Sequence, residues 1–397
     1  MSDYIPSEIL VEIFKRLPVK SVLQLRSVSK PWKSLIDSSE FIAAYGAHQT
    51  QLQSLLVTYK DPESEQPDET YASLVDDETF VPQEIRPTLP LLAKLLRPSR
   101  VIGSSHGLVC LSANDPYQND HKPLGRKMAV LCNPSIRKSV GVTVHLAIDM
   151  PKSYVLGFGV CPITSDPTIL KINVGVVEVF TLRTRSWRVL SYNPQINSLK
   201  FPRRQVVVGR FIYFVAYVEK EKPLIVSFDM TTHEFRTKDI PDSFARQPCP
   251  YFSISKVSEA LVVLKYNTMG MGDWAVWIVD DGVPNSCTKL FTISNVPRAI
   301  CLTTVLGFTD RSELLIERQD DVAGWRKSSL FVYEPCSQHI DDIGIDGIQG
   351  SFSVGYYMET LLLLDQPDSS VYVENGVGPM DFRLWINLLP DEVLVIK

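Results

Sequence analysis

The stretch Leu224-Ile225-Val226-Ser227-Phe228-Asp229, followed by a polar turn and then Phe235, is one copy of a pattern that recurs along the chain. In each copy an apolar run leads into a short polar turn, and another apolar or aromatic residue follows. The other copies lie at residues 128–134, 177–182, 275–280 and 330–335. Short runs rich in β-branched and aromatic residues, without long helical periods, predict an all-β region.

The copies are evenly spaced. The residues that mark their turns, at positions 133, 182, 229, 280 and 334, lie 47 to 54 residues apart. A period near 50 residues is that of kelch-type propeller blades, in which each four-stranded sheet buries its faces against its neighbours. Residues 74–76 could begin the series, and residues 359–364 and 370–373 supply strands at its end. We expect six blades, with seven as the alternative, in a ring closed by pairing residues 55–59 with C-terminal strands.

The first 45 residues have a helical pattern instead. Apolar residues from Ile9 to Leu17 recur at spacings of three and four, which predicts an amphipathic helix with Pro6 in its first turn and its end at Pro18. A second short helix at 19–28, a third capped by Ser29, and a half-helix around 41–45 follow. The fold class is α+β by domain: a small three-helix N-terminal domain, then an all-β propeller.

Composition narrows the function. The chain has 397 residues, of which 45% are hydrophobic and 21% charged, and a net charge of −5, which argues against binding to nucleic acid. It lacks 18 consecutive apolar residues and a signal-peptide pattern, so we expect no membrane association and a cytoplasmic or nuclear location, or both. Seven dispersed cysteines favour reduced thiols over a disulfide framework or a zinc knuckle.

An acidic segment separates the two regions. Residues 60–86 contain nine acidic and two basic residues with interspersed prolines, a composition typical of a solvated loop. The flanking runs at 55–59 and 71–75 predict strands, so the segment can form a hairpin loop. A plain solubilising loop is the simpler interpretation. The hypothesis that the loop binds a basic target predicts that its deletion weakens target binding.

Catalytic and metal patterns are weak. Residues 103–107, Gly-Ser-Ser-His-Gly, satisfy Gly-x-Ser-x-Gly, but a nucleophile elbow needs a helix after it and a predicted strand follows here. His106 and Cys110 lack a second close pair of metal ligands. The glycine pairs at 157–159 and 270–272 lack the third glycine and helix of a dinucleotide loop and predict turns or bulges. We therefore expect a non-catalytic protein without cofactor or metal.

The N-terminal helices leave apolar surface to be covered. A unit of about 40 residues rarely closes a stable core by itself. Pro6, Ile9, Leu10, Leu17 and Trp32 are among the apolar residues that three short helices cannot all bury. A partner that lays its own helices on this surface is one interpretation, and packing against the rest of this chain is the other.

The N-terminal residues resemble an F-box. The resemblance rests on residues 5–10 (Ile-Pro-Ser-Glu-Ile-Leu), 13–21 (Ile-Phe-Lys-Arg-Leu-Pro-Val-Lys-Ser), 26–36 (Arg-Ser-Val-Ser-Lys-Pro-Trp-Lys-Ser-Leu-Ile) and Phe41. It implies binding to the Skp-type adaptor of cullin–RING ubiquitin ligases. Ile5 stands where Leu is usual and Ser29 where Cys is common, and neither change adds a charge. The residues expected to contact the adaptor are Ile5, Pro6, Ile9, Leu10, Ile13, Leu17, Pro18, Leu23, Leu25, Val28 and Trp32.

The β region is similar to the plant F-box-associated interaction domain of F-box/kelch-repeat proteins. The similar residues are 103–111 (Gly-Ser-Ser-His-Gly-Leu-Val-Cys-Leu), 133–138 (Asn-Pro-Ser-Ile-Arg-Lys), 157–159 (Gly-Phe-Gly), 177–182 with 186–188, and 289–291. Cys132 replaces a usual Trp, and Val160-Cys161 a usual Tyr-Asp. The expected domains are an F-box at 1–46, a connecting segment with the first propeller strands and acidic loop at 47–99, and the propeller at 100–397.

Together the two resemblances imply a substrate receptor of an SCF (Skp–cullin–F-box) ubiquitin ligase. The F-box would bind the Skp adaptor and, through it, the cullin and RING subunits, while propeller loops hold a protein target whose identity the sequence does not give. A receptor of this kind raises the concentration of target lysines near a thioester made elsewhere. The alternatives are a non-degradative interaction module and a kelch-type propeller enzyme.

Overall fold

The computed structural model describes residues 5–49, 54–61, 63, 69–74, 82–83, 99–114, 127–144, 154–173, 176–190, 196, 199–201, 204–218, 222–240, 251–266, 274–279, 287–293, 302–309, 311–319, 327–372 and 380–381. The chain divides into two compact units. The first comprises Met1–Ser54, Arg86–Pro151 and Tyr356–Lys397, and the second Leu55–Ile85 and Lys152–Gly355. Most of the acidic segment at 60–86 and the glycine pair at 270–272 lie outside the described residues, and with them the predictions made for both.

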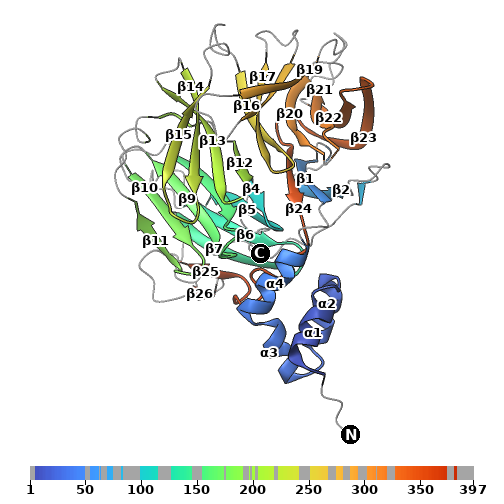
Figure 1. The fold of residues 1–397 in the computed structure, drawn as a ribbon, viewed down its shortest axis with the longest axis vertical. Helices are drawn as coiled ribbons and strands as arrows, with labels where there is room; N and C mark the ends of the chain where they lie inside the picture. Colours follow the sequence, from blue (N-terminus) through green and yellow to red (C-terminus); the bar gives the residue numbers. More distant parts are fainter. Residues whose placement is uncertain are drawn as a thin grey trace. The chain divides into compact units, whose positions relative to one another are not determined.

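Four helices begin the first unit (Figure 1, blue). They are α1 (Ser7–Phe14), α2 (Val19–Arg26), α3 (Lys30–Ile36) and α4 (Ser39–Gln49). Ser29 caps α3 as predicted, because its Oγ accepts a hydrogen bond of 3.3 Å from the Trp32 N–H. Pro6 is the N-cap of α1 and does not lie within its first turn. The predicted half-helix is wrong: α4 has 11 residues, because Phe41, Ile42 and Tyr45 recur on one face and are all buried.

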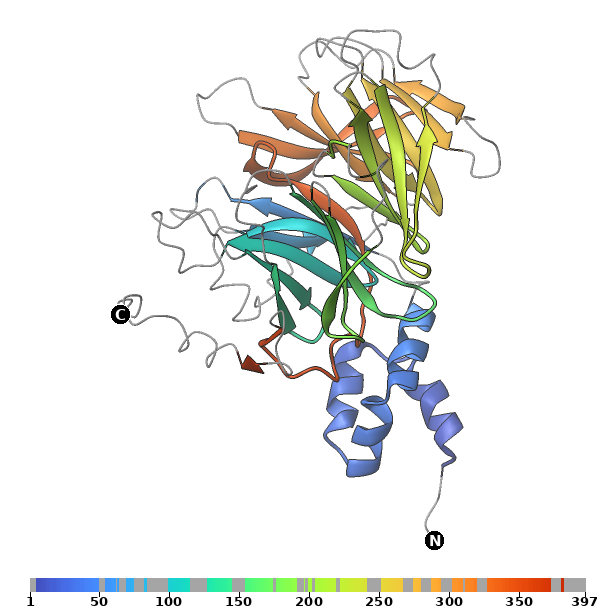
Figure 2. The same cartoon turned by 90° about the vertical axis from the view of Figure 1, so that its left-hand side faces the viewer.

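The second unit is built of four-stranded sheets. One sheet has the order β24-β1-β2-β3, and the other four follow the chain order as antiparallel meanders (Figures 1 and 2). Neighbouring β24 and β1 confirm the predicted pairing of residues 55–59 with a C-terminal strand. The strands are β1 (Ser54–Lys60), β2 (Glu69–Leu74), β3 (Pro82–Gln83), β8 (Tyr154–Val160), β9 (Pro167–Asn173), β10 (Val176–Thr181), β11 (Ser186–Val189), β12 (Gln205–Val208), β13 (Phe211–Val218), β14 (Lys222–Asp229), β15 (Phe235–Asp239), β16 (Tyr251–Val257), β17 (Ala260–Tyr266), β18 (Trp274–Val279), β19 (Cys287–Ile293), β20 (Leu302–Phe308), β21 (Leu314–Gln319), β22 (Lys327–Glu334), β23 (His339–Ile348) and β24 (Ser353–Tyr357).

The remaining sheet belongs to the first unit and has six strands. Its order is β26-β25-β7-β6-β5-β4. The strands are β4 (Ser99–Ser105), β5 (Leu108–Asn114), β6 (Lys127–Asn133), β7 (Lys138–Val144), β25 (Ser370–Tyr372) and β26 (Met380–Asp381). The strand β25 pairs in parallel with β7, so a C-terminal strand extends a meander of four.

The recurring pattern has a single structural meaning. Its copies are β6, β10, β14, β18 and β22, each of which pairs on both sides within its sheet. Because these strands have neighbours on both edges, they carry the most continuous apolar runs. The evenly spaced pattern therefore predicted one interior strand in each of five sheets.

The predicted number of blades is wrong. The described residues form five four-stranded blades and not six or seven, because the sheet around β6 is enlarged by β25 and β26 to six strands. The strand predicted at residues 370–373 is confirmed for 370–372, and residue 373 lies outside the described residues, but the strand predicted at 359–364 is wrong, because residues 359–361 have no regular structure and 362–364 form a turn. A parallel pairing between strands more than 200 residues apart has no local sequence signal.

Gly157 and Gly159 are not in a turn or bulge. Both lie within β8, whose register with β9 is regular. A Cβ on Gly157 would lie 2.7 Å from Cζ of Phe214, and one on Gly159 would lie 2.6 Å from Sδ of Met230. The two glycines therefore allow the neighbouring sheet β12–β15 to pack closely on β8.

Candidate functional site

The residues predicted to contact an adaptor all keep some solvent exposure. Six of them are exposed: Ile5, Pro6, Ile9, Ile13, Pro18 and Val28. The other five are half-buried against the helical core: Leu10, Leu17, Leu23, Leu25 and Trp32. The structure therefore brings the predicted residues to one helical segment and separates them into a solvent-facing set and a supporting set.

The solvent-facing set consists of apolar residues, although the exposed face of a surface helix is usually polar. Ile9 and Ile13 lie four residues apart on α1 and are 50% and 45% exposed, and Val28 after α2 is 62% exposed. Isolated apolar side chains on a surface are ordinary, but a group of large aliphatic residues on one short segment indicates a contact surface. Adaptor contact itself remains a prediction for all eleven residues.

Part of the helical core comes from the other end of the chain. Residues 356–366, here called the C-terminal strap, pass beside the helices (Figures 1 and 2, red). Leu361 and Leu364 of the strap are 0% and 4% exposed and pack in one cluster with helical residues. The helical members of this cluster are Phe14, Val19, Val22, Ile36, Phe41, Ile42 and Tyr45. The strap therefore supplies part of the cover that the short helices lack.

Polar contacts fix the helices to the strap. The Val19 N–H at the start of α2 donates a hydrogen bond of 2.8 Å to Oε2 of Glu359. This N–H is one of the donors that a helix start leaves without an internal partner, and a carboxylate there also suits the helix dipole. The Tyr45 hydroxyl donates to the Leu17 carbonyl at 2.9 Å, and burial, followed by the charge of Glu359, raises the pKa of Tyr45.

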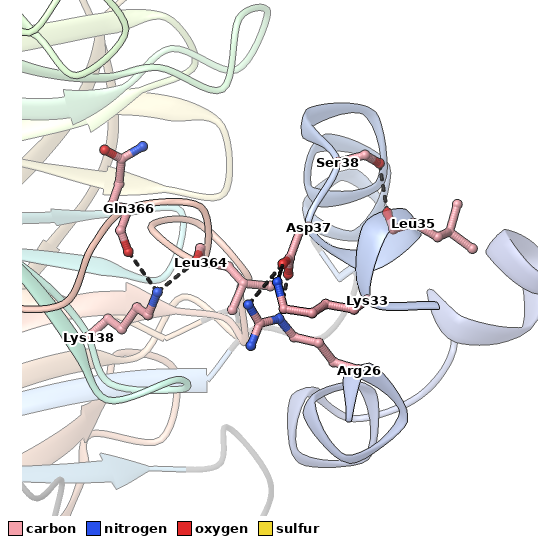
Figure 3. A network of polar contacts seen from close by, with 8 residues as sticks. All are labelled: Arg26, Lys33, Leu35, Asp37, Ser38, Lys138, Leu364 and Gln366. Carbon is pink, nitrogen blue, oxygen red and sulfur yellow. Dashed lines mark hydrogen bonds and ion pairs between the residues drawn. The ribbon is translucent and has the colours of Figure 1, made fainter. Parts of the chain in front are cut away.

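The strap is held in turn by the β6–β7 turn. Asn133 is fully buried, and its Nδ2 donates to the carbonyls of Thr360 and Leu362 at 3.0 and 2.6 Å. The Lys138 ammonium donates to the carbonyls of Leu364 and Gln366, each at 2.7 Å (Figure 3). The helices, the strap and this turn thus form one continuous structure within the first unit.

An ion cluster joins α2 to α3. The Arg26 guanidinium donates from Nε and a terminal nitrogen to the two carboxylate oxygens of Asp37 at 2.5 and 2.9 Å, and Lys33 Nζ lies 2.7 Å from Oδ2 (Figure 3). Burial alone would raise the pKa of Asp37, but the hydrogen bonds from Arg26 and Lys33 outweigh it and hold that pKa below its usual value. The bidentate geometry fixes the angle between the two helices.

The replacement Asp37→Asn is expected to lower the free energy of unfolding by about 1 kcal/mol at neutral pH. Because the pKa of Asp37 is lower in the folded state, its carboxylate stabilises the fold above the unfolded-state pKa and loses this effect as the pH falls through the folded-state value. In urea unfolding curves the difference between variant and wild type should therefore begin to shrink near the unfolded-state pKa of about 4 and vanish only below the lower folded-state pKa. Asp239→Asn, at an exposed aspartate of β15, is the control. A difference that stays constant with pH would contradict the assignment.

The catalytic alternative at residues 103–107 has no structural support. Ser105 ends β4, His106 and Gly107 form the turn at φ +48° and +77°, and β5 begins at Leu108. A strand follows where an elbow needs a helix. A Cβ on Gly107 would lie 2.2 Å from the Met358 carbonyl, so this glycine is needed where the strap passes. In the part of the chain that the structure describes, no three His, Cys, Asp or Glu side chains gather as metal ligands.

The residues that support the site could not be identified from the sequence. Glu359, Leu361 and Leu364 lie in a run whose composition predicts a strand, and Lys138 has no role that the sequence assigns. Asn133 marks a turn and belongs to a stretch that carries the family resemblance, but the sequence assigns its side chain no contact. The sequence Asn-Pro-Ser-Ile-Arg-Lys at 133–138 places an asparagine amide next to a proline turn. This indicates that the amide makes specific hydrogen bonds, but it does not indicate which groups are its partners.

The comparison with protein families accounts for both parts of the chain. The F-box domain family matches residues 3–43. The family described as F-box associated beta propeller domain matches residues 64–366. The chain belongs to the F-box associated beta propeller family. These matches show an all-β propeller behind a helical F-box. They do not show the kelch type that the period of the strands led us to expect.

Similar proteins of Arabidopsis thaliana are F-box proteins by name. At3g07870 is 23% identical over 409 residues, which cover 92% of this chain and 93% of that protein. At4g19940 is 24% identical over 381 residues, covering 86% of each. At3g16210 is 23% identical over 252 residues, and the match spans 62% of its length.

Solved propellers align only weakly with the chain. The periplasmic gluconolactonase of Pseudomonas aeruginosa is 10% identical, with 77% of this chain and 99% of that chain covered and a TM-score of 0.40. A similarity of this size supports no conclusion about activity. Within the described residues, no helix has both the length and the apolar character that a membrane span requires.

Proposed function

We propose that this member of the F-box associated beta propeller family is the substrate-recognition subunit of an SCF ubiquitin ligase. In this role the F-box binds a Skp-type adaptor, and through it a cullin and a RING subunit, while the β-propeller binds a protein target. The chain performs no bond chemistry. It holds target lysines near the charged ubiquitin-conjugating enzyme and so raises their effective concentration. The expected location is the cytoplasm, the nucleus or both.

The observation that carries this proposal is the apolar surface of α1. Ile9 and Ile13 remain exposed although the strap packs on the buried residues of the helices, such as Phe14 and Val22. Intramolecular packing therefore leaves these two isoleucines uncovered, and we assign them to contact with a partner. The alternative interpretation of the sequence is that the apolar residues pack against the rest of this chain. That packing accounts for the residues that contact the strap, but not for Ile9 and Ile13.

The variant Ile9→Asp is expected to weaken adaptor binding at least about 100-fold, because it places a charge in the apolar contact and leaves the helical core intact. Ile9 is preferable to Leu10, which is half-buried in the core and would also lower stability. The measurement is binding of the purified full chain to a Skp adaptor by isothermal calorimetry, with co-elution of the cullin as a second readout.

The matched control is Val218→Asp, an aliphatic residue of similar exposure, 44%, at the end of β13 in the second unit. It should bind the adaptor as the wild type does. Wild-type protein that fails to bind any Skp adaptor would refute the proposal. Adaptor binding with an unchanged lifetime of every captured protein would favour the non-degradative interaction module.

A further inference from the structure

Four turns of the second unit join into one surface at an edge of two adjacent sheets. They follow β8, β10, β12 and β14 and comprise residues 161–166, 182–185, 209–210 and 230–234. With β11 residues up to Arg188, they are called the turn surface here. All of these residues are described, and none belongs to the F-box or the strap. The turn surface therefore shares no residue with the adaptor site.

Contacts between the turns show that they are continuous. The Arg183 N–H donates to Oδ1 of Asp166 at 2.9 Å, which joins the first turn to the second. Cys161 Sγ and Thr231 Oγ1 lie 3.5 Å apart, which joins the first turn to the fourth across the two sheets. The Met230 N–H donates to the Arg210 carbonyl at 3.0 Å. The Arg188 guanidinium also contacts Nδ1 of His233, so β11 closes the set.

The core beneath the turn surface is rigid. Val177 and Val179 of β10 pack in one buried cluster with Phe214 and Phe228 of the next sheet. The last of these rings stacks on His233 at 5.8 Å. Turns that are tied to each other and to a packed core present their side chains in fixed positions, which lowers the entropic cost of binding.

The accessible charge of the turn surface is positive, although the chain as a whole is negative. Arg183, Arg185 and Arg188 are exposed. The Arg210 Nε lies 3.1 Å from Oδ2 of Asp229, whose side chain is 1% exposed, so these two charges offset each other. Within the four turns the carboxylates are Asp166, which is half-buried beneath Arg183, and Glu234. The exposed charged residues of the turn surface are thus three arginines and one glutamate.

The first turn also carries an exposed apolar residue. Ile163, at the tip of this turn, is 65% exposed, and the preceding Pro162 is exposed as well. An exposed aliphatic tip on a surface that also carries three exposed arginines has the composition of a protein contact surface, in which Arg is enriched and an apolar centre excludes water. Ile163 does not belong to the buried cluster that the first of the two adjacent sheets forms with the second.

We propose that the turn surface binds an acidic, extended segment of the target protein, with an aliphatic side chain of the segment on Ile163 and carboxylates on Arg183, Arg185 and Arg188. The proposal deepens the proposed function, since it assigns the target's chemistry, and it rests on that function for the fate of the bound protein. Guanidinium groups pair with carboxylates in bidentate geometry, which gives orientation as well as charge.

Separate carboxylates fit this surface better than a single phosphate group. The three exposed arginines belong to different positions of a turn and a strand, and the carboxylate of Asp166 accepts a hydrogen bond from the backbone of one of them, Arg183. A phosphate dianion near Arg183 would be repelled by this carboxylate more strongly than a single carboxylate charge would be. An acidic segment can instead place one charge at each arginine.

The test selects binders without assuming a target. A phage-displayed library of random peptides is panned on the wild-type full chain, and the selected peptides are labelled with fluorescein and titrated by fluorescence anisotropy. We expect peptides in which Asp or Glu flank an aliphatic residue, with affinities that fall steeply as salt is raised. The double variant Arg183→Glu with Arg188→Glu should weaken them by roughly tenfold or more.

Two further variants separate binding from folding. Arg185 has φ +55°, a conformation that asparagine tolerates better than arginine, so Arg185→Asn should keep or raise thermal stability and still weaken the peptides. Arg311→Glu changes an exposed arginine in the corresponding β20–β21 turn of another sheet and should leave the affinity unchanged.

Several results would overturn the proposal: no peptide selected, selected peptides without acidic residues, or peptides that bind the double variant as tightly as the wild type. Much tighter binding of a phosphoserine copy of a selected peptide would assign the surface to a phosphate ligand and also overturn it. The peptide titrations contain no adaptor, so they test the turn surface alone. A failure of the wild type to bind an adaptor would refute the proposed function and would leave the peptide result unchanged.

Discussion

Replacing Leu361 by alanine is expected to lower the free energy of unfolding by about 2–5 kcal/mol and to loosen helices more than 300 residues away in sequence. The side chain is 0% exposed and packs in the helical cluster with residues such as Val22 and Phe41. Its truncation removes apolar contacts and leaves a cavity in a core that is small to begin with. Urea unfolding measures the total loss, and hydrogen exchange locates it.

The region that loses stability in Leu361→Ala decides whether the strap is part of the helical core. Hydrogen exchange should accelerate in α1 to α4, and adaptor affinity should fall because the docking surface is no longer held in one conformation. Leu264→Ala is the matched control: Leu264 is 1% exposed in a buried cluster of the second unit, so it should cost a similar free energy without changing exchange in the helices. Helices that exchange equally in the wild type and in Leu361→Ala would show that the strap is not part of their core.

The helices and the interior strands could be predicted because their signals are local. The spacing from Ile9 to Leu17 predicts α1, although the helix ends at Phe14 and not at Pro18, and the Ser29 hydroxyl caps α3 within three residues of itself. The interior strands are the most continuously apolar because they are paired on both edges, so they repeat visibly even where the outer strands vary. The apolar residues expected to contact an adaptor lie within one short segment for the same reason, and adaptor contact itself stays a prediction.

The strap could not be predicted because its role depends on distant partners. Residues 360–364, Thr-Leu-Leu-Leu-Leu, have the composition of a buried strand. In the structure Leu363 adopts φ +70°, so the run turns back on itself and directs Leu361 and Leu364 into the helical cluster. The hydrogen bonds that impose this turn come from the β6–β7 turn more than 200 residues earlier. No period in the sequence reports such a pairing.

The same reasoning predicts that Asn133→Asp is the most damaging single-atom exchange in the first unit. Asn133 is fully buried, and its Oδ1 accepts from the Ser135 and Ile136 N–H groups at 2.9 and 3.4 Å while its Nδ2 donates to the strap. An aspartate keeps the two acceptor contacts but places an oxygen where Nδ2 lay 2.6 Å from the Leu362 carbonyl. Two carbonyls lose their donor and a charge is buried, so we expect a loss of at least about 3 kcal/mol at pH 7.

The loss from Asn133→Asp should depend on pH in a direction that the geometry fixes. Burial and the facing carbonyls would raise the folded-state pKa of the new carboxyl, so the variant gains stability as the pH falls toward the unfolded-state value of about 4, where a protonated carboxyl can donate one bond to the strap. Urea unfolding at neutral and mildly acidic pH measures this gain. Asp229 ends β14 and accepts the same kind of turn hydrogen bonds, from the Thr231 and Thr232 N–H groups. Asp229→Asn is therefore the reciprocal control. It should lower the free energy of unfolding by less than Asn133→Asp does, because it removes an ion pair with Arg210 but buries no new charge. An Asn133→Asp variant as stable as the wild type at pH 7 would mean that the amide does not hold the strap, and that the contacts of Lys138, Glu359, Leu361 and Leu364 suffice to hold it.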